Sequence, residues 1–404
     1  MNWKLKFGVI WTGQAISVFT SSVLQMAIIW YIALTTNSAL LLSLASFAGF
    51  LPMAVLGSFA GAFVDRWNRK FTMIGADLYI ALISTVLGVY ALFASPPLWL
   101  ILAVLFFRSI GSAFHTPAIS AVTPLLVPEE FLTKCAGYTQ SIQTIGFIAG
   151  TSVAAVLFPI WGLSGMVWLD VGGAILASAA VLFVKIPSPP KTEDSGKAEK
   201  PGMFSEIKSA FEILRAHKGL FVLLWGGTIF MMVYSPINAL YPLMSLDYFG
   251  GTTTEAAIAE IAFAIGMTLG GVILGIWGGF KKRNITMTIS ILFSGLPLAA
   301  SGLLPPTGFV FFAAFSFLVG FSVPLYTGPH TALMQEKIPP GFLGRVFGLY
   351  GSLMSIAMLI GLVVSGTLAE IIGVNTWFLI SGLVIASLAV VMFLNPHVRN
   401  IEKD

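Results

Sequence analysis

Twelve stretches of about 20 mostly apolar residues run through this chain of 404 residues. A stretch of that length can cross the hydrocarbon core of a bilayer as a helix. Only 9% of the residues are charged, compared with roughly a quarter in a soluble globular protein. The sequence therefore predicts an all-α polytopic membrane protein. The predicted helices cover residues 7–34, 40–64, 72–94, 97–118, 133–158, 166–186, 219–247, 255–280, 285–304, 309–332, 345–370 and 376–394.

The one long polar segment lies between the sixth and seventh predicted helices, from Pro187 to Lys218. Its first half is typical of a flexible linker. Its second half places apolar residues on one helical face, which predicts a short surface helix. Those apolar residues are Phe204, Ile207, Phe211 and Leu214. The predicted organisation is an N-terminal six-helix bundle (1–186), a cytoplasmic linker with this helix (187–218), a C-terminal six-helix bundle (219–394) and a cytoplasmic tail (395–404).

The basic residues predict the orientation of the chain in the membrane. With the N-terminus inside, the predicted cytoplasmic segments hold 20 of the 21 Lys and Arg residues, and the outer loops hold none. Such a bias predicts that both termini are cytoplasmic and that the number of spans is even. The first apolar stretch, 7–34, is too long for the core of a cleaved secretory signal and is expected to remain as a helix. The net charge of +4 is thereby explained without a nucleic-acid partner.

The two halves of the chain resemble each other. Residues 121–137, AVTPLLVPEEFLTKCAG, align without gaps on residues 332–348, ALMQEKIPPGFLGRVFG, at an offset of 211. The shared features are a β-branched residue before Pro, a Phe-Leu pair, a cation and a Gly. Parallel repeats of this kind are a transporter design with the substrate site near mid-membrane. A common cytoplasmic turn would explain the match without a repeat, but not the linker at the midpoint.

The loop after the second predicted helix resembles the signature G-x-x-x-D-R-x-G-R-K of the major facilitator superfamily. The matching residues are Gly61, Asp65, Arg66, Arg69 and Lys70, with Asn68 in place of a Gly. Asn tolerates a left-handed backbone, so the turn is expected to survive. The resemblance implies that the Asp holds a cytoplasmic gate at the N-terminus of the eleventh helix, near Arg345. It also implies twelve helices in two pseudo-symmetric six-helix bundles.

Longer segments are similar to the macrolide efflux proteins of that superfamily. They read LQMAIIWYI, LPMAVLGSFAG, FRSIGSAFHTPA, AVTPLLVPEEFLTKCAGY and PINALYPLMSLDYFGG, and the resemblance covers nearly the whole chain. The stretch from Gly146 to Ala155 partly resembles an antiporter motif, although packing of small residues explains it equally well. The resemblance implies proton-driven export of macrolides across a bacterial plasma (inner) membrane by a protein that works as a monomer.

Polar residues within the predicted helices are the candidates for substrate binding, because charges and amides are costly in lipid. Arg108 lies near the middle of the fourth helix, with Ser112 and His115 on the same face. His115 and His330 are expected to be hydrogen-bonded residues near helix ends. In the superfamily, helices 1, 4, 7 and 10 line the central cavity. The predicted substrate-binding residues are Gln14, Gln25, Arg108, Tyr234, Asn238 and Tyr241.

Proton coupling requires a carboxyl group that can become neutral, and burial disfavours its charged form. Glu260, Asp170 and Asp77 lie inside predicted helices and are the candidates, with Arg108 as a possible counter-charge. Macrolides carry a basic amine, so an acidic group is expected in the cavity. The cavity-facing charge that the sequence indicates most clearly is the cation Arg108, which opposes this expectation.

Three functions remain open from the sequence. The first is an exporter of amphipathic small molecules in exchange for protons. The second is an exporter or flippase of an endogenous amphiphile such as a siderophore or lysophospholipid. The third is a ligand sensor that kept the fold and lost transport. No Walker A pattern and no nucleophile–base arrangement occurs in the sequence, so neither an ATP-driven pump nor an enzyme is expected, and no cofactor or metal is predicted. The protein is expected to be surrounded by membrane lipid.

Overall fold

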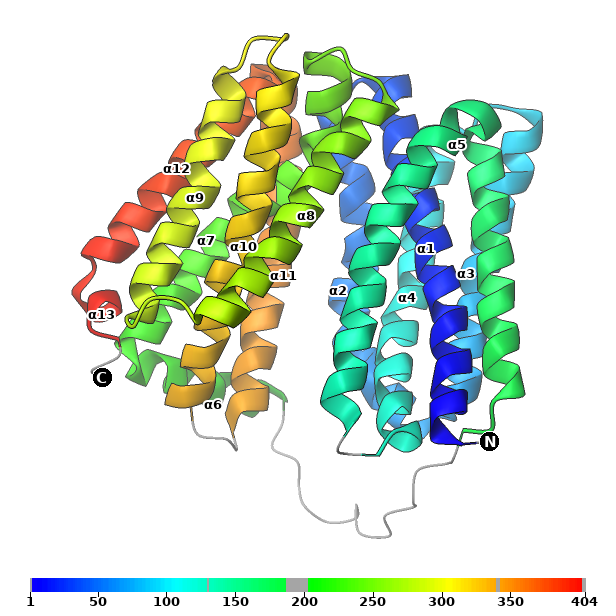
Figure 1. The fold of residues 1–404 in the computed structure, drawn as a ribbon, viewed down its shortest axis with the longest axis horizontal. Coiled ribbons are helices and arrows are strands. Elements are labelled where there is room, and N and C mark those ends of the chain that lie inside the picture. Colours follow the sequence, from blue (N-terminus) through cyan, green and yellow to red (C-terminus); the bar gives the residue numbers. More distant parts are fainter. Residues whose placement is uncertain (1, 129–130, 187–202, 339–341, 402–404) are drawn as a thin grey trace. The chain divides into compact units, whose positions relative to one another are not determined.

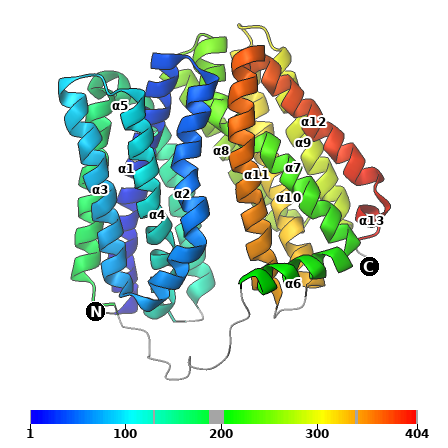
Figure 2. The same cartoon turned by 180° about the vertical axis from the view of Figure 1, so that it is seen from behind.

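The structure, a computed structural model, describes residues 2–128, 131–186, 203–338 and 342–401. The described residues are overwhelmingly helical, and they contain no β-strand. They divide into two compact units, of which unit 1 comprises residues 1–37 and 44–192 and unit 2 comprises residues 38–43 and 193–404. Figures 1 and 2 show the helices from two opposite sides. The domain boundaries predicted from the sequence remain predictions.

Five helical elements belong to the first half of the chain. They are α1 (Trp3–Thr36), α2 (Ala39–Arg66), α3 (Arg69–Phe93), α4 (Leu98–Leu126) and α5 (Leu132–Phe183). The second half contains α6 (Met203–Ala216), α7 (Lys218–Leu243), the π-helical turn η2 (Met244–Tyr248), α8 (Thr253–Trp277), α9 (Arg283–Leu303), α10 (Phe309–Lys337), α11 (Leu343–Ile372), α12 (Val374–Leu394) and α13 (Pro396–Arg399).

Eleven helices of the described chain are long and apolar enough to cross a membrane. One of them, α5, is two helices joined by a break, and Figure 1 shows its two segments running in opposite directions. Pro159 lacks the backbone N–H that an unbroken helix needs, and Gly162 has φ 62° and ψ −171°, a conformation open essentially to Gly. The predicted helices 133–158 and 166–186 are therefore both present, and the twelve-helix fold is confirmed.

The internal repeat is visible in the backbone. Both α4 and α10 end immediately before a β-branched residue in extended conformation, Val127 (φ −111°, ψ 131°) and Ile338 (φ −99°, ψ 129°). Both following helices begin after a Phe with nearly equal angles, Phe131 (φ −104°, ψ −4°) and Phe342 (φ −112°, ψ −9°). The two pairs are separated by the offset of 211 found in the sequence, so the aligned segments adopt the same turn.

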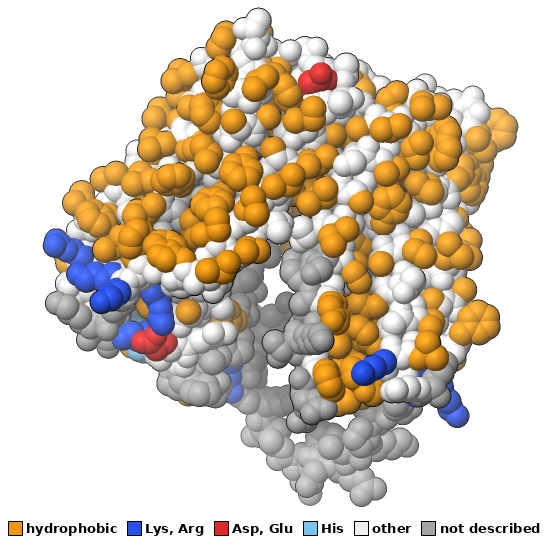
Figure 3. All heavy atoms as spheres, viewed as in Figure 1, with side chains coloured by type: hydrophobic (Ala, Val, Ile, Leu, Met, Phe, Trp, Pro, Cys, Tyr) orange, Lys and Arg blue, Asp and Glu red, His pale blue; other side chains and the backbone are white. Residues whose placement is uncertain are grey.

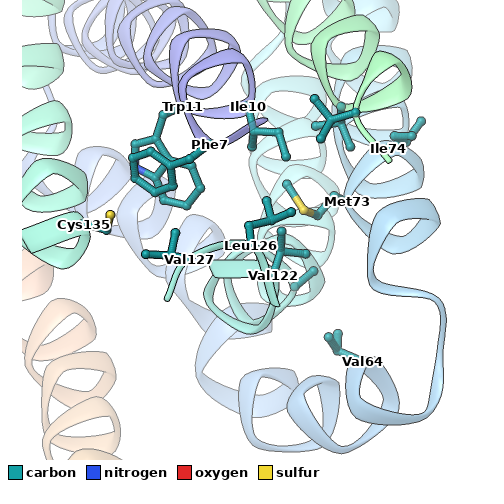
Figure 4. Packing of buried hydrophobic residues seen from close by; sticks show 13 residues of the cluster. Phe7, Ile10, Trp11, Val64, Met73, Ile74, Val122, Leu126, Val127 and Cys135 are labelled. Carbon is teal, nitrogen blue, oxygen red and sulfur yellow. The ribbon is translucent and has the colours of Figure 1, made fainter. Parts of the chain in front are cut away.

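The first half of the chain has a buried hydrophobic cluster at the end where α1 begins (Figure 4). Phe7 and Trp11 of α1 stack with ring centroids 4.1 Å apart and an interplanar angle of 18°. Residues from α3, α4 and α5 surround them, including Met73, Val122 and Cys135, all of them buried. The indole nitrogen of Trp11 donates to the hydroxyl of Thr139 at 2.9 Å, which ties α1 to α5.

The helix α6 lies between the linker and the second set of spans. It packs against α7 and α11, and Phe211 contacts Phe221 of α7 edge to face at 5.5 Å. Leu214 is buried whereas Lys208 and Arg215 are exposed, so the helix is amphipathic as predicted. The side chains of Phe204 and Ile207, also predicted on the apolar face, lie outside the described residues.

The surface matches a chain whose surroundings are lipid. On the face drawn in Figure 3, hydrophobic side chains cover most of the visible area of each unit. Large apolar side chains such as Phe93, Phe183 and Ile276 are more than 80% exposed, which water would penalise and lipid would not. Lys and Arg side chains on this face gather near one end of the helices.

Candidate functional site

Unit 1 contains a polar cavity of about 480 Å³ between α1, α2, α3, α4 and α5. Gln14 and Gln25 from α1 line it together with Arg108 from α4. Asp77 from α3 and His115 from α4 face the same space. Trp11 lines the cavity and also belongs to the hydrophobic cluster of Figure 4, so the cavity ends on that core. Three of the predicted substrate-binding residues therefore meet at one site.

Arg108 and Asp170 form a buried ion pair at the edge of this cavity. The Nη1 atom of Arg108 lies 2.5 Å from Oδ2 of Asp170, and the two side chains are 13% and 2% exposed. Ser21 of α1 donates to the other oxygen, Oδ1, at 2.7 Å, and Ser84 of α3 donates to Oδ2 at 3.4 Å. Arg108 also contacts the Ser84 hydroxyl. The network joins α1, α3, α4 and the second segment of α5.

Asp77 and His115 form a second, looser pair. The Nε2 atom of His115 lies 3.2 Å from Oδ1 of Asp77, whose side chain is 4% exposed, while the His115 side chain is 18% exposed. Asp77 Oδ2 has no hydrogen-bond partner among the described residues. The expectation that His115 is a helix-end residue is wrong, because α4 continues eight residues beyond the predicted boundary at 118. The sequence signal was present, since Arg108 and His115 share a helical face, but the partner on α3 is separated from His115 by 38 positions.

The polar residues of α1 differ in exposure. Gln14 is 4% exposed and its amide nitrogen makes no hydrogen bond to a described residue. Gln25 is exposed and lines the cavity. Ser21, between them, is occupied by Asp170. Gln14 is therefore a buried amide beside the cavity whose donor has no partner among the described residues.

The three residues predicted on α7 are distributed between the interior and the surface of unit 2. Tyr241 is buried in an aromatic cluster, with ring centroids 5.3 Å from Phe312 and 5.6 Å from Phe378. Tyr234 is also buried and stacks on Phe230 at 4.9 Å, whereas Asn238 is exposed. The role of these residues in substrate binding stays a prediction.

A stack of aromatic rings in unit 2 was not anticipated from the sequence. His330 of α10 lies between Tyr326 and Tyr350, with centroid separations of 5.5 and 4.9 Å, and is 5% exposed. Phe230 of α7 extends the stack at 6.0 Å from Tyr326. The spacing of four between Tyr326 and His330 was the available signal. Glu260 lies elsewhere, on α8, partly buried, and no described residue forms a salt bridge with it.

The gating motif is described only in part. Gly61, Asp65 and Arg66 lie in α2, but their side chains are outside the described residues, so the predicted contact between Asp65 and the start of α11 stays a prediction. Lys70 donates to the carbonyl groups of Leu182 and Val184, both at 2.8 Å, at the C-terminal end of α5.

Two cations of the motif set are also placed. Arg69 donates to the carbonyl of Ala121 at 3.0 Å. Arg345 of α11 lies 5.5 Å from the ring centroid of Phe342. Arg69 and Lys70 therefore bind backbone carbonyls of the first half, those of Lys70 at the end of a helix, which is a structural use of these cations.

Asn68 serves the turn in a way that differs from the expectation. Its φ of −71° and ψ of 106° are extended and not left-handed, and it is the N-cap of α3. Its side-chain oxygen accepts from the backbone N–H groups of Lys70 at 3.1 Å and Phe71 at 3.4 Å. An Asn is suited to this position because it satisfies amides at the helix start that have no partner within the helix.

This difference can be tested by substitution. We expect Asn68→Asp to leave the melting temperature of the purified protein nearly unchanged, because the carboxylate keeps the cap. Asn68→Ala should cost about 1 kcal/mol of stability, and Asn68→Gly a few tenths. A variant with Gly that is clearly more stable than wild type would contradict the capping role and favour a left-handed requirement.

Comparison with known proteins places this arrangement in a family. A sequence profile of the Major Facilitator Superfamily matches residues 10–258 and 223–404. Macrolide efflux protein A of Streptococcus pyogenes is 51% identical over 401 residues, which are 99% of this chain and 98% of that protein. Macrolide efflux protein A of Enterococcus faecalis is 52% identical over 326 residues, covering 81% of this chain and all of that protein.

Solved structures agree on the fold alone. The POT family transporter PepTSo superposes with a TM-score of 0.77 at 12% identity, covering 100% of this chain and 99% of that chain. The nucleoside transporter NupG superposes with a TM-score of 0.74 at 16% identity, covering 98% of this chain and 100% of that one. The chain is therefore a multi-pass membrane transporter, not an enzyme, and it belongs to the major facilitator superfamily and, within it, to the family of the macrolide efflux proteins.

Proposed function

We propose that this protein exports amphipathic cations of the macrolide class in exchange for protons. The observation that carries the proposal is the polar cavity of unit 1, whose volume of about 480 Å³ falls within the range of small-molecule sites, roughly 300–1,000 Å³. It combines amides, hydroxyl groups and a carboxylate with apolar side chains such as Met26, Phe50 and Phe147. This combination suits a large molecule that has both an apolar body and polar groups.

The charge of the cavity also favours a cationic substrate. An unpaired Arg108 would oppose a cation, but its guanidinium is paired with Asp170 at 2.5 Å. The pair has no net charge, so Asp77 is left as the carboxylate of the cavity whose partner, His115, can be neutral. A substrate amine entering the cavity therefore meets a carboxylate and not an uncompensated cation.

The proton pathway is part of the proposal. Glu260, Asp170 and Asp77 are the three carboxyl groups that the sequence placed within helices as proton carriers. Asp170 is held by a guanidinium and two hydroxyl groups. Glu260 and Asp77 have no such permanent counter-charge among the described residues. We place the protein in the bacterial plasma membrane with both termini in the cytoplasm, as the basic residues indicate.

The experiment that tests the function is accumulation of labelled erythromycin in a bacterium without its major efflux pumps. Cells that express the protein should accumulate less label than cells with an empty vector, because export works against entry. A protonophore should raise accumulation to the level of the empty-vector control, since the gradient that drives export is lost. Immunodetection of the protein in the membrane fraction serves as the control for expression.

Two outcomes would favour the alternatives. Equal accumulation in expressing and control cells, with the protein present in the membrane, would exclude macrolides as substrates. It would favour an endogenous amphiphile as the substrate. Binding of erythromycin by the purified protein without any response to the proton gradient would favour a ligand sensor.

A further inference from the structure

Building on the proposed proton-driven export, we propose that His115 and Asp77 together form the site at which proton and cationic substrate compete. The imidazole of His115 takes up a proton on Nε2 beside the Asp77 carboxylate. When a cationic substrate enters the cavity and approaches Asp77, that proton leaves Nε2 for water. One bound positive charge is thereby exchanged for another in the same cavity.

The geometry of the pair fits this exchange. Nε2 of His115 and Oδ1 of Asp77 are 3.2 Å apart, close enough for an ion pair when the imidazole carries a proton, and Nε2 makes no hydrogen bond to a described residue. The second oxygen, Oδ2, is buried without a hydrogen-bond partner among the described residues. A buried carboxylate oxygen without a donor is costly, and a proton or a substrate ammonium would each relieve that cost. Both residues line the cavity, and their Oδ2 and Nε2 atoms are buried at its wall.

The neighbouring ion pair cannot do the same. The guanidinium of Arg108 stays charged at every physiological pH, and it lies 2.5 Å from Asp170. Asp170 also accepts from Ser21 and Ser84, so its oxygens already have donors. His is the side chain whose ordinary charge change falls between about pH 5 and 8. The Arg108–Asp170 pair therefore holds the helices together, whereas the His115–Asp77 pair changes its charge.

The charged surroundings of the pair are simple. Apart from Asp77 and His115, the titratable side chain in the described lining of the cavity is Arg108, on the same face of α4. The lining from α1, α2 and α5 consists of amides, hydroxyl groups, aromatic rings and aliphatic groups. Arg69, two turns before Asp77 on α3, donates to the carbonyl of Ala121. Within the described residues, the proton on His115 is thus balanced by Asp77 and opposed by Arg108, whose own charge Asp170 offsets.

The second half of the chain differs at the equivalent position. At the repeat offset of 211, Tyr326 of α10 corresponds to His115 of α4. Tyr326 is stacked between Phe230 and His330, with centroid distances of 6.0 and 5.5 Å. No described carboxylate forms a salt bridge with His330. The carboxylate–imidazole pair is therefore a feature of the first half alone among the described residues.

The test uses the full-length protein reconstituted in proteoliposomes with labelled erythromycin. Two reactions are measured, namely accumulation driven by an imposed pH gradient and exchange of labelled for unlabelled erythromycin without a gradient. We expect His115→Asn and Asp77→Asn to slow gradient-driven accumulation by about tenfold or more, because proton transfer through a placed side chain is lost. Exchange needs no net proton movement, so His115→Asn should slow it much less than it slows gradient-driven accumulation.

The pH dependence of exchange provides a readout that a purely structural role would not change. Wild-type exchange should slow as the pH is lowered through the range in which His gains a proton, since protonated His115 repels the substrate cation. Exchange by His115→Asn should lose most of this dependence. The matched control is His397→Asn, which removes an exposed imidazole outside the cavity and should leave both reactions as in wild type.

Each outcome decides one question. If the wild-type protein does not accumulate erythromycin under a pH gradient, the proposed function is wrong and this inference falls with it. If the wild type and both variants accumulate it equally, the function stands and the inference is wrong. If His115→Asn loses both reactions although it melts like wild type, His115 is needed for substrate movement itself, which also overturns the inference. If Asp77→Asn fails to fold, the two reactions measured with His115→Asn decide the question, because His115 is partly exposed and its substitution is expected to be tolerated.

Discussion

Asp170→Asn is expected to destabilise the detergent-solubilised protein by about 3 kcal/mol or more, measured as a fall in melting temperature. The substitution removes the carboxylate charge but leaves the Arg108 guanidinium, with a side chain only 13% exposed, without its counter-charge. An uncompensated charge in a low-dielectric interior is more costly than the pair was favourable. The loss should be accompanied by loosening of α1, α3, α4 and α5, which the network joins.

The double variant Arg108→Gln/Asp170→Asn should recover most of that stability. It replaces the ion pair by neutral groups that can still bond to each other and to Ser21 and Ser84. A double variant as unstable as the sum of the two single variants would show that the two side chains act independently, contrary to the geometry.

A solvent-exposed ion pair in unit 2 provides the control. Arg283 and Glu336 are paired, but their side chains are 38% and 54% exposed. Exposed pairs gain little because water and salt screen them. Glu336→Gln should therefore leave the melting temperature unchanged within error, although it also removes a carboxylate from an arginine.

Gly266→Ala is the second substitution with a large expected effect, here on the packing of α8 against α10. A Cβ at Gly266 would overlap the carbonyl oxygen of Phe317, and one at Gly320 would overlap that of Phe263. These neighbours are backbone atoms, which cannot rotate away as a side chain can. The helices must therefore separate along their contact, and we expect a loss of about 1–3 kcal/mol or more in thermal stability.

Gly275→Ala on the same helix is the matched control. No atom lies within 4 Å of a Cβ built there, and the residue is exposed. Because Ala favours a helix over Gly by roughly 0.5–1 kcal/mol, this variant should be as stable as wild type or slightly more stable. Equal effects of the two substitutions would show that the α8–α10 contact does not depend on the missing side chain at Gly266.

The fold was predictable from the sequence because a bilayer restricts what an apolar chain can form. Stretches of about 20 apolar residues can be satisfied in lipid only as helices, so their number follows from counting. The repeat at an offset of 211 was also correct, since turns at helix ends depend on local residues such as Val127 and Phe131. The turn at Asn68 survives as expected, but in an extended and not a left-handed conformation, because Asn is compatible with both and the sequence does not choose between them.

The sequence predicted single residues of the site but not the contacts between them. Gln14, Gln25 and Arg108 were identified because polar groups in lipid are costly, a property of each residue alone. That Asp170 neutralises Arg108, and that Asp77 faces His115, depends on which helix faces turn toward one another. Those contacts join residues 62 and 38 positions apart, and they follow from helix packing throughout the bundle. The sequence thus determined that this chain is a twelve-helix transporter, whereas the tertiary structure alone decided which of its buried charged side chains lie next to one another.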